Sequence, residues 1–165
     1  MICPSCAFDN LAGEDHCDKC GLTLMQEDTN PEYTAGKAAR IITDPIYKVA
    51  LPPALIVAPN AGVMATMVKM LEQQRNCALV VEKKDIVGIF TERDALKKIT
   101  SADMEIQDME IHLIMTKQPH TLLETDSISF AFNKMAMGTF RHVPIKKRDG
   151  GYSVFTARDA MNYLF

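Results

Sequence analysis

The sequence predicts an α+β fold in which two copies of one β-α-β-β-α unit follow a short cysteine-rich segment. The pattern Phe-Thr-x-Arg-Asp-Ala occurs at 90–95 and again at 155–160. Apolar strands and amphipathic helices precede it in the same order both times. Four of the five cysteines lie within the first 20 residues, outside the repeat. The 165-residue chain therefore divides into a small first module and a duplicated second one.

The cysteine-rich segment has the spacing of a metal-binding knuckle. Cys3, Cys6, Cys17 and Cys20 form two C-x2-C pairs. Each pair directs two thiolates to one point, and four thiolates complete the tetrahedral site that zinc prefers. Gly21 follows the second pair, where such a turn favours a residue that tolerates positive φ. We expect a structural zinc ribbon in residues 1–26, with iron held by the same sulfurs as an alternative.

The charge of this segment argues against nucleic acid as its partner. Residues 1–26 hold one lysine against four acidic residues, and the whole chain has a net charge of -3. Contacts with phosphate need a basic surface. We expect the ribbon to brace the fold or to dock on an unknown protein partner. A nucleic-acid-associated zinc ribbon is kept as an alternative.

Residues 26–36 are polar and predict a linker, which is assigned to 27–42, and the two repeats are then assigned to 43–102 and 103–165. Apolar residues at helical spacing begin after Asn60 in the first repeat and after Asp126 in the second, and both residue types cap helices well. An apolar strand, a polar turn, a second strand and a final helix follow each time. One repeat is too short to bury a good core alone, so we expect the two to share one.

This order closely resembles the CBS domain, and the two copies together resemble a CBS pair, also called a Bateman module. The second copy is the closer match to the family pattern. It begins with Ile114-Met115-Thr116, its middle strand is 141–145, and it ends with the motif Thr156-x-x-Asp159. The first copy keeps 88–94, but its lead-in at 47–53 is atypical, and Ser153 stands where it has Gly88. The resemblance covers residues 43–165.

The resemblance implies that an adenosine-containing ligand (AMP, ADP, ATP or S-adenosylmethionine) binds in the clefts between the repeats. In this family the aspartate of the motif commonly accepts hydrogen bonds from both ribose hydroxyls. Asp94 and Asp159 are therefore the ribose candidates, with Thr91 and Thr156 beside them. A carboxylate suits a vicinal diol, and helix N-termini attract phosphate. Taken from the residues alone, the same Thr-x-x-Asp is also a helix capping box, and that alternative stays open.

The resemblance also places phosphate-binding cations at Arg141 and His142. The positions taken as equivalent in the first repeat are Cys77 and Ala78, which cannot bind phosphate. Ala78 is kept among the residues that line the ligand. The sequence thus predicts two unequal sites, with a phosphorylated ligand at the one that Arg141 and His142 reach.

A regulatory protein is expected, and not an enzyme. The sequence lacks a G-x-x-x-x-G-K-[ST] loop and a Ser/His/Asp pattern. Four thiolate ligands would also leave zinc without an open coordination position for catalysis. The alternative is a scaffold whose CBS pair dimerises without a ligand. The family implies a homodimer formed through the CBS helices, where several methionines could supply either surface or core: Met64, Met67, Met70, Met135 and Met137.

Neither a membrane protein nor an exported one is expected. The longest apolar run, from Val49 to Pro59, holds three prolines and is far shorter than the about 20 residues that span a bilayer. The chain does not open with a basic region followed by an apolar stretch, so a cytoplasmic location is expected.

Overall fold

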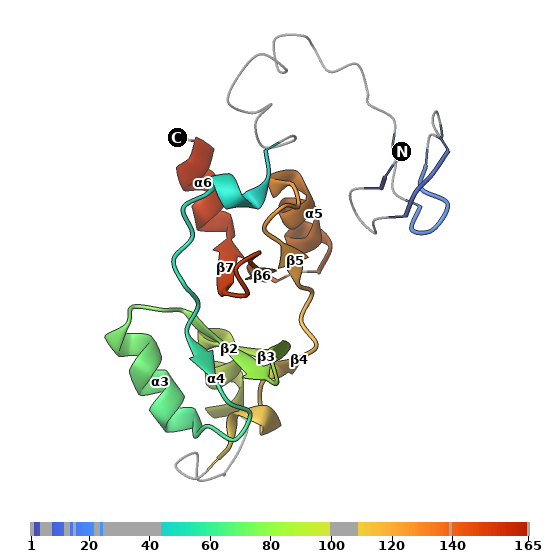
Figure 1. Ribbon diagram of the computed structural model, residues 1–165. Coiled ribbons are helices and arrows are strands. Elements are labelled where there is room, and N and C mark those ends of the chain that lie inside the picture. The colour runs from blue at the N-terminus through green and yellow to red at the C-terminus, as the bar shows by residue number, and fades with distance from the viewer. Residues whose placement is uncertain are drawn as a thin grey trace. The chain divides into compact units, whose positions relative to one another are not determined.

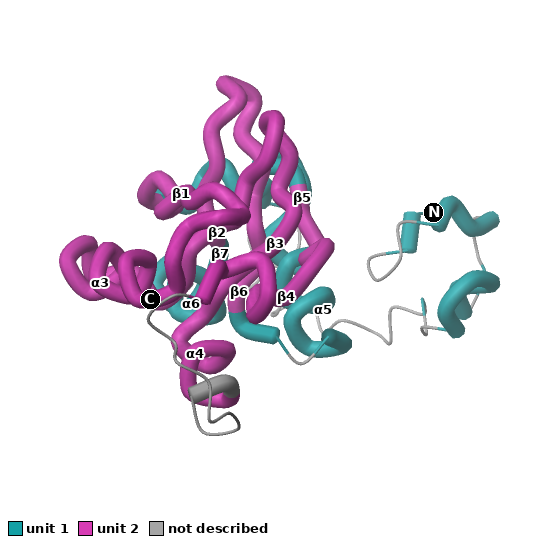
Figure 2. The backbone as a smooth tube through the Cα atoms, turned by 90° about the horizontal axis from the view of Figure 1, so that it is seen from below, with its two compact units in different colours: residues 1–51, 123–141, 155–165 teal, residues 52–122, 142–154 magenta. Residues whose placement is uncertain are grey.

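The computed structural model describes residues 2–3, 8–11, 14, 16–21, 24, 44–99, 109–138 and 140–164. The segment predicted to be a linker lies outside them. By its internal contacts the chain forms two compact units (Figure 2). One consists of residues 1–51, 123–141 and 155–165, and the other of residues 52–122 and 142–154. Each unit therefore contains segments of both sequence repeats.

Both repeats have the β-α-β-β-α order that the sequence predicts (Figure 1). The elements of the first repeat are β1 (Ile56–Val57), α3 (Val63–Glu72), β2 (Cys77–Glu82), β3 (Asp85–Thr91) and α4 (Glu92–Ile99). Those of the second are β5 (Leu122–Leu123), α5 (Ile128–Gly138), β6 (His142–Lys146), β7 (Tyr152–Thr156) and α6 (Ala157–Leu164). A short 3-10 helix precedes the first strand of each repeat, η1 (Ile46–Lys48) before β1 and η3 (Ile111–Leu113) before β5, and β4 (Thr116–Lys117) follows η3. The mixed α+β class is thereby confirmed.

The strands form a four-stranded sheet in the order β1-β2-β3-β4 and a three-stranded sheet in the order β5-β6-β7. In the first sheet, β1 runs parallel to β2, while β2 and β3 form an antiparallel hairpin. Helix α3 packs on β2 and α4 packs on β3. Because side chains alternate along β2, Ala78 and Val80 face the core that includes Phe90, whereas Cys77 and Leu79 join a second cluster.

The segment before the first strand of each repeat, 44–55 in the first and 109–121 in the second, is called its lead-in segment and is hydrogen-bonded to the other repeat. In the second unit, β4 leads into the second repeat but pairs with β3 of the first, and Gln118 donates its N–H to the Val87 carbonyl at 3.1 Å. Reciprocally, Pro53 pairs with Ser153 of β7, and the Ala54 N–H donates to the Tyr152 carbonyl at 2.9 Å. The sequence repeats are thus not the structural units.

The same exchange occurs around the two 3-10 helices. In the first unit, the N–H groups of Ile46 and Tyr47 donate to the carbonyls of Asp126 and Glu124, each at 2.8 Å. In the second unit, the equivalent N–H groups at 111 and 112 donate to the carbonyls at 61 and 59, at 2.8 and 3.1 Å. The donors in the second unit lie 65 residues after those in the first, and the acceptors lie 65 residues before those in the first. The two lead-in segments therefore have the same pattern of hydrogen bonds.

Two predicted N-caps are wrong, by two residues and by one residue. Helix α3 begins at Val63 with Gly62 as its N-cap and without a side-chain cap, so Asn60 does not cap it. Helix α5 begins at Ile128, and its cap is Ser127, whose Oγ accepts the Phe130 N–H at 3.1 Å. The Asp126 carboxylate instead accepts the Leu123 N–H at 2.8 Å. Before α5, Asp126 and Ser127 are both good capping residues, and the sequence pattern does not choose between them. Before α3, Asn60 is the only such residue, and the helix begins beyond it.

A buried carboxylate ties the first lead-in segment to the last helix within the first unit. Asp44 is only 9% exposed, and the Tyr163 hydroxyl of α6 donates to its Oδ2 at 2.6 Å. Lys48 donates to the Asp44 Oδ1 at 2.5 Å, and this hydrogen bond raises the pKa of Lys48 above its ordinary value. Met109 stands at the equivalent position before the second repeat, so this ionic network has no counterpart there.

The methionines divide between core and surface. Met70 and Met135 are buried, at 4% and 7% exposure, whereas Met64 and Met137 are exposed, and Met67 is half-buried. On α3 the exposed face also carries Val68 and Leu71, at helical spacing from Met64. Helix α3 therefore presents an apolar stripe to solvent within the described part of the chain.

Candidate functional site

The Thr-x-x-Asp motif of the first repeat lies where β3 ends and α4 begins. The Asp94 carboxylate accepts two hydrogen bonds at its Oδ2, from the Thr91 N–H at 3.0 Å and from the Thr91 hydroxyl at 2.7 Å. The Asp94 N–H lies 3.3 Å from the Thr91 Oγ1 and donates to it. The motif is therefore a capping box at the helix N-terminus, and both side chains are half-buried.

The second motif, at the junction of β7 and α6, repeats this geometry. The Asp159 Oδ2 accepts the Thr156 N–H at 2.8 Å and the Thr156 hydroxyl at 2.6 Å, and the Asp159 N–H donates to the Thr156 Oγ1 at 3.3 Å. The matching distances show that duplication has kept the local structure as well as the residues.

Each capping box leaves one carboxylate oxygen available. Among the residues that the structure describes, neither Asp94 nor Asp159 forms a hydrogen bond through Oδ1. An ionised carboxylate oxygen has two lone pairs and can accept two donors. The cap fixes the carboxylate at Oδ2 and the helix N-terminus favours nearby negative charge. Such an oxygen can accept hydroxyl groups of a ligand without giving up the cap.

The candidate cations of the second repeat lie at the start of β6. His142 is the first residue of the strand and is half-buried, while Arg141 before it is exposed. Strand β2 of the first repeat begins at Cys77, 65 residues earlier, which makes Asn76 and Cys77 the equivalents of Arg141 and His142. The equivalence to Cys77 and Ala78 expected from the sequence is thus wrong by one residue. The conclusion that the first repeat lacks cations at these positions does not change.

These positions lie next to the motif in the first repeat. Cys77 pairs with Thr91 across the β2–β3 ladder, and the Glu92 N–H lies 3.3 Å from the Asn76 carbonyl. Cys77 is buried, at 8% exposure, as expected of a small apolar side chain. Ala78 is fully buried in the helix-facing core and pairs with Phe90. Its side chain therefore faces this core, and its predicted place beside the ligand stays a prediction.

Three of the four knuckle cysteines converge. The Sγ atoms of Cys3, Cys17 and Cys20 all lie within 4.8 Å of one another, and those of Cys3 and Cys20 are 3.6 Å apart. Cys6 lies outside the described residues. Gly21 has φ +70° and donates its N–H to the Cys17 carbonyl at 2.8 Å, which confirms the expected turn after the second pair. Three sulfurs at this spacing fit thiolate coordination of one tetrahedral ion.

Sequence reasoning missed a buried asparagine in the knuckle. Asn10 is only 4% exposed, and its side chain donates to the Phe8 carbonyl at 3.0 Å while accepting the Asp18 N–H at 3.0 Å. A signal was present, since an asparagine between two C-x2-C pairs can satisfy backbone groups on both sides. Its role needs the fold, because Asp18 is eight residues away along the chain.

The comparisons with known proteins identify the family. A family model for the CBS domain matches residues 46–101 and 108–165. The chain belongs to the CBS-domain family. Its two matched segments show a tandem CBS pair, as the sequence predicts.

Curated relatives of this CBS pair are distant in sequence. An uncharacterized 17.7 kDa protein in the bps2 3′ region of Acidianus ambivalens is 29% identical over 132 residues, which cover 79% of this chain and 74% of that protein. CBS domain-containing protein CBSCBSPB1 of Arabidopsis thaliana is 29% identical over 96 residues, covering 58% of this chain. The match spans only 18% of that plant protein.

Solved structures share the fold. The CBS domain protein PAE2072 from Pyrobaculum aerophilum, complexed with AMP, has a TM-score of 0.63 and 22% identity, over 70% of this chain and 88% of that one. The CBS domain pair of protein MJ0100, in complex with 5′-methylthioadenosine and S-adenosyl-L-methionine, has a TM-score of 0.63 and 19% identity, over 72% and 93% of the two chains.

In the described part of this chain, helices are too short or too polar to cross a bilayer.

Proposed function

We propose that this CBS pair binds an adenosine-containing ligand and is the sensing part of a regulatory protein. The observation that carries the proposal is the duplicated motif, in which Asp94 and Asp159 each keep one carboxylate oxygen uncommitted. Two proteins of similar fold were solved with AMP or with S-adenosyl-L-methionine and 5′-methylthioadenosine, which supports the ligand class. The proposed role is binding and not catalysis.

In this proposal the same aspartate caps the helix and binds the ribose. The threonine hydroxyl and N–H hold Oδ2 of the aspartate, so that Oδ1 is presented in a fixed direction to the two ribose hydroxyls. Hydrogen bonds to a charged group contribute about 1.5–3 kcal/mol each. Losing the acceptor at one site should therefore weaken ligand binding there by at least about tenfold.

The test replaces each aspartate by asparagine and measures adenosine, AMP, ADP, ATP and S-adenosylmethionine binding by calorimetry. In Asp94→Asn and Asp159→Asn, the amide oxygen can take the place of Oδ2 and keep the cap. The amide nitrogen then replaces Oδ1 and cannot accept a ribose hydroxyl. We expect lost affinity at the altered site with a nearly unchanged melting temperature. Wild-type affinity in both variants would contradict the ribose assignment.

We further propose that the two sites are unequal, because Arg141 and His142 supply cations that Asn76 and Cys77 do not. Arg141→Ala and His142→Ala should weaken binding of AMP but leave adenosine binding unchanged, since only AMP carries a phosphate. Lys83→Ala, a change at an exposed lysine in the β2–β3 turn, is the matched control. Equal losses for AMP and adenosine would contradict a phosphate role.

The alternative function is a scaffold that dimerises without a ligand. It is supported by the exposed apolar stripe of α3, formed by Met64, Val68 and Leu71. A saturating thermal shift with a nucleotide, following RT ln(1 + [L]/Kd), favours the sensor. No shift with any nucleotide, combined with a dimer that Val68→Asp dissociates in light scattering, favours the scaffold.

We also propose that the knuckle holds one structural zinc ion through Cys3, Cys6, Cys17 and Cys20, and that the ribbon docks on a protein partner. Convergence of three of these sulfurs within 4.8 Å supports the metal site. Metal analysis of the native protein distinguishes zinc from iron, and Cys6→Ser tests the fourth ligand. Stoichiometric metal that survives Cys6→Ser with unchanged affinity would contradict its assignment.

A further inference from the structure

Asn10 is a buried polar side chain in a module with little room for a core. Its exposure is 4%, whereas its neighbours Asp9 and Leu11 are exposed. A buried amide is costly unless its donor and its acceptor are both satisfied. Both ends of the Asn10 amide have partners, and the identity of those partners indicates its role.

The donor end of Asn10 stays on its own segment, which is hydrogen-bonded to the backbone of the first cysteine. Its Nδ2 donates to the Phe8 carbonyl at 3.0 Å. The same carbonyl accepts the Cys3 N–H at 2.8 Å, and Ile2 pairs with Asp9 in the adjoining bridge. The Phe8 carbonyl therefore joins the Asn10 amide to the backbone of the Cys3 ligand.

The acceptor end of Asn10 reaches the second pair of cysteines. Its Oδ1 accepts the N–H of Asp18 at 3.0 Å, and Asp18 lies in the turn between Cys17 and Cys20. The Asn10 carboxamide thus links the Cys17–Cys20 turn to the Phe8 carbonyl, to which the Cys3 backbone is also bonded. The hydrogen bonds run through backbone groups, so they fix where the cysteine backbones lie, independently of the sulfurs themselves.

We infer that Asn10 is a positioning residue for the knuckle metal, holding the two cysteine-bearing segments at the separation that coordination needs. The inference rests on the proposed metal site. Asparagine suits the role because the amide offers one donor group and one acceptor in a fixed plane. Aspartate would keep the acceptor for Asp18 but set a second oxygen against the Phe8 carbonyl. Outer partners of this kind typically change metal affinity by 10–100-fold when removed.

The experiment compares wild-type full-length protein with Asn10→Ala, Asn10→Asp and the control Leu11→Ala, whose side chain is 75% exposed. Zinc affinity and release rate are measured by competition with a chelator, and Co²⁺ is used as a spectroscopic probe of the ligand set. We expect zinc binding about 10–100-fold weaker in both Asn10 variants, with faster release. The Co²⁺ spectrum should keep its thiolate bands, because no ligand has been removed. The Asp18 amide should exchange faster with solvent in Asn10→Ala.

The outcomes separate this inference from the metal site itself. Wild-type protein that binds no metal would overturn the proposed site. Metal binding in wild type with unchanged affinity in both Asn10 variants would overturn the positioning role alone. An equal loss in Leu11→Ala would also overturn it, because any change in the loop would then suffice. Changed thiolate bands in Asn10→Ala would mean that the ligand set itself depends on Asn10, which contradicts a purely positioning role.

Discussion

Gly88 lies in β3 at a point where the Met115 side chain occupies the space that a Cβ would need. A Cβ placed on Gly88 would meet Sδ, Cγ and Cε of Met115, at 2.9 Å from Cγ and 3.0 Å from Cε and closer still to Sδ. Met115 immediately precedes β4, the lead-in strand that pairs Lys117 with Gly88. Gly88→Ala therefore tests whether the Met115 side chain is held tightly against the first sheet.

Two opposing effects determine the magnitude. Alanine restricts the unfolded chain more than glycine does, which stabilises the native state by about 0.4–1 kcal/mol where the backbone conformation allows it. Forcing the extra methyl group into a packed site costs about 1–3 kcal/mol. We therefore expect Gly88→Ala to lower the free energy of unfolding by about 1–2 kcal/mol. Met115 has rotatable bonds and will absorb part of the clash, which excludes the upper end of the range.

A double-mutant cycle with Met115→Ala isolates this contact. With the Met115 side chain removed, the same Gly88→Ala change should become stabilising, by about 0.4–1 kcal/mol, because only the backbone effect remains. Urea unfolding followed by circular dichroism, at constant zinc concentration, gives the four free energies. A neutral Gly88→Ala in the native background, or a cost that persists after Met115→Ala, would refute the reasoning.

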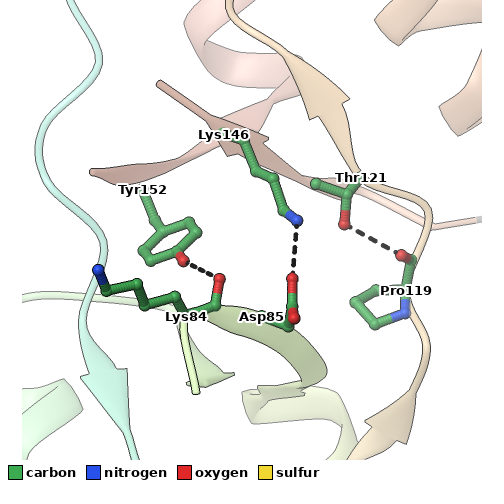
Figure 3. A network of polar contacts seen from close by, with 6 residues as sticks. All are labelled: Lys84, Asp85, Pro119, Thr121, Lys146 and Tyr152. Carbon is green, nitrogen blue, oxygen red and sulfur yellow. Dashed lines mark hydrogen bonds and ion pairs between the residues drawn. The ribbon is translucent and has the colours of Figure 1, made fainter. Parts of the chain in front are cut away.

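Three further changes test individual polar contacts. Ser153 is fully buried and its Oγ has no hydrogen-bond partner among the described residues, so Ser153→Ala should raise the free energy of unfolding by about 1 kcal/mol in urea titrations. Lys84 has φ 71° in the β2–β3 turn, and Lys84→Gly should raise the melting temperature, since the strained backbone costs about 1–2 kcal/mol. The hydrogen bond from the Tyr152 hydroxyl to Lys84, at 2.6 Å, ends on the backbone carbonyl, which glycine keeps (Figure 3). Tyr163→Phe should destabilise the protein by about 1.5–3 kcal/mol, because it removes the hydrogen bond to the buried Asp44 carboxylate, and an unchanged melting curve would show that this bond contributes nothing.

The repeated unit could be predicted from the sequence because it is encoded locally. Alternating and helical apolar patterns identified strands and helices, and the Thr-x-x-Asp motif marked the strand-to-helix junctions where Asp94 and Asp159 lie. The same reasoning left capping and ligand binding as alternatives. The structure shows the cap and leaves Oδ1 available for a ligand, so the two readings do not exclude each other.

What the sequence did not predict depends on contacts between distant segments. The pairing of β4 with β3, and the bridge between Pro53 and Ser153, cross from one repeat to the other and leave no periodic pattern. The missing side chain at Gly88 is explained only by Met115 across that ladder. Asn10 has likewise no identifiable partner in the sequence, because the Asp18 N–H reaches it only after the knuckle has folded.

The lead-in segments also determine which fragments of this chain can exist alone. A fragment that ends before Met109 would lose the strand that covers Gly88, exposing the edge of β3 and leaving carbonyls at 59 and 61 without their N–H donors. A fragment that starts there would lose Pro53 and Ala54 from β7. Exposed strand edges of this kind favour aggregation or the exchange of segments between molecules. Each half, separately expressed, should therefore aggregate or recombine with the other when the two are mixed, and transfer of this module between proteins would require both halves together.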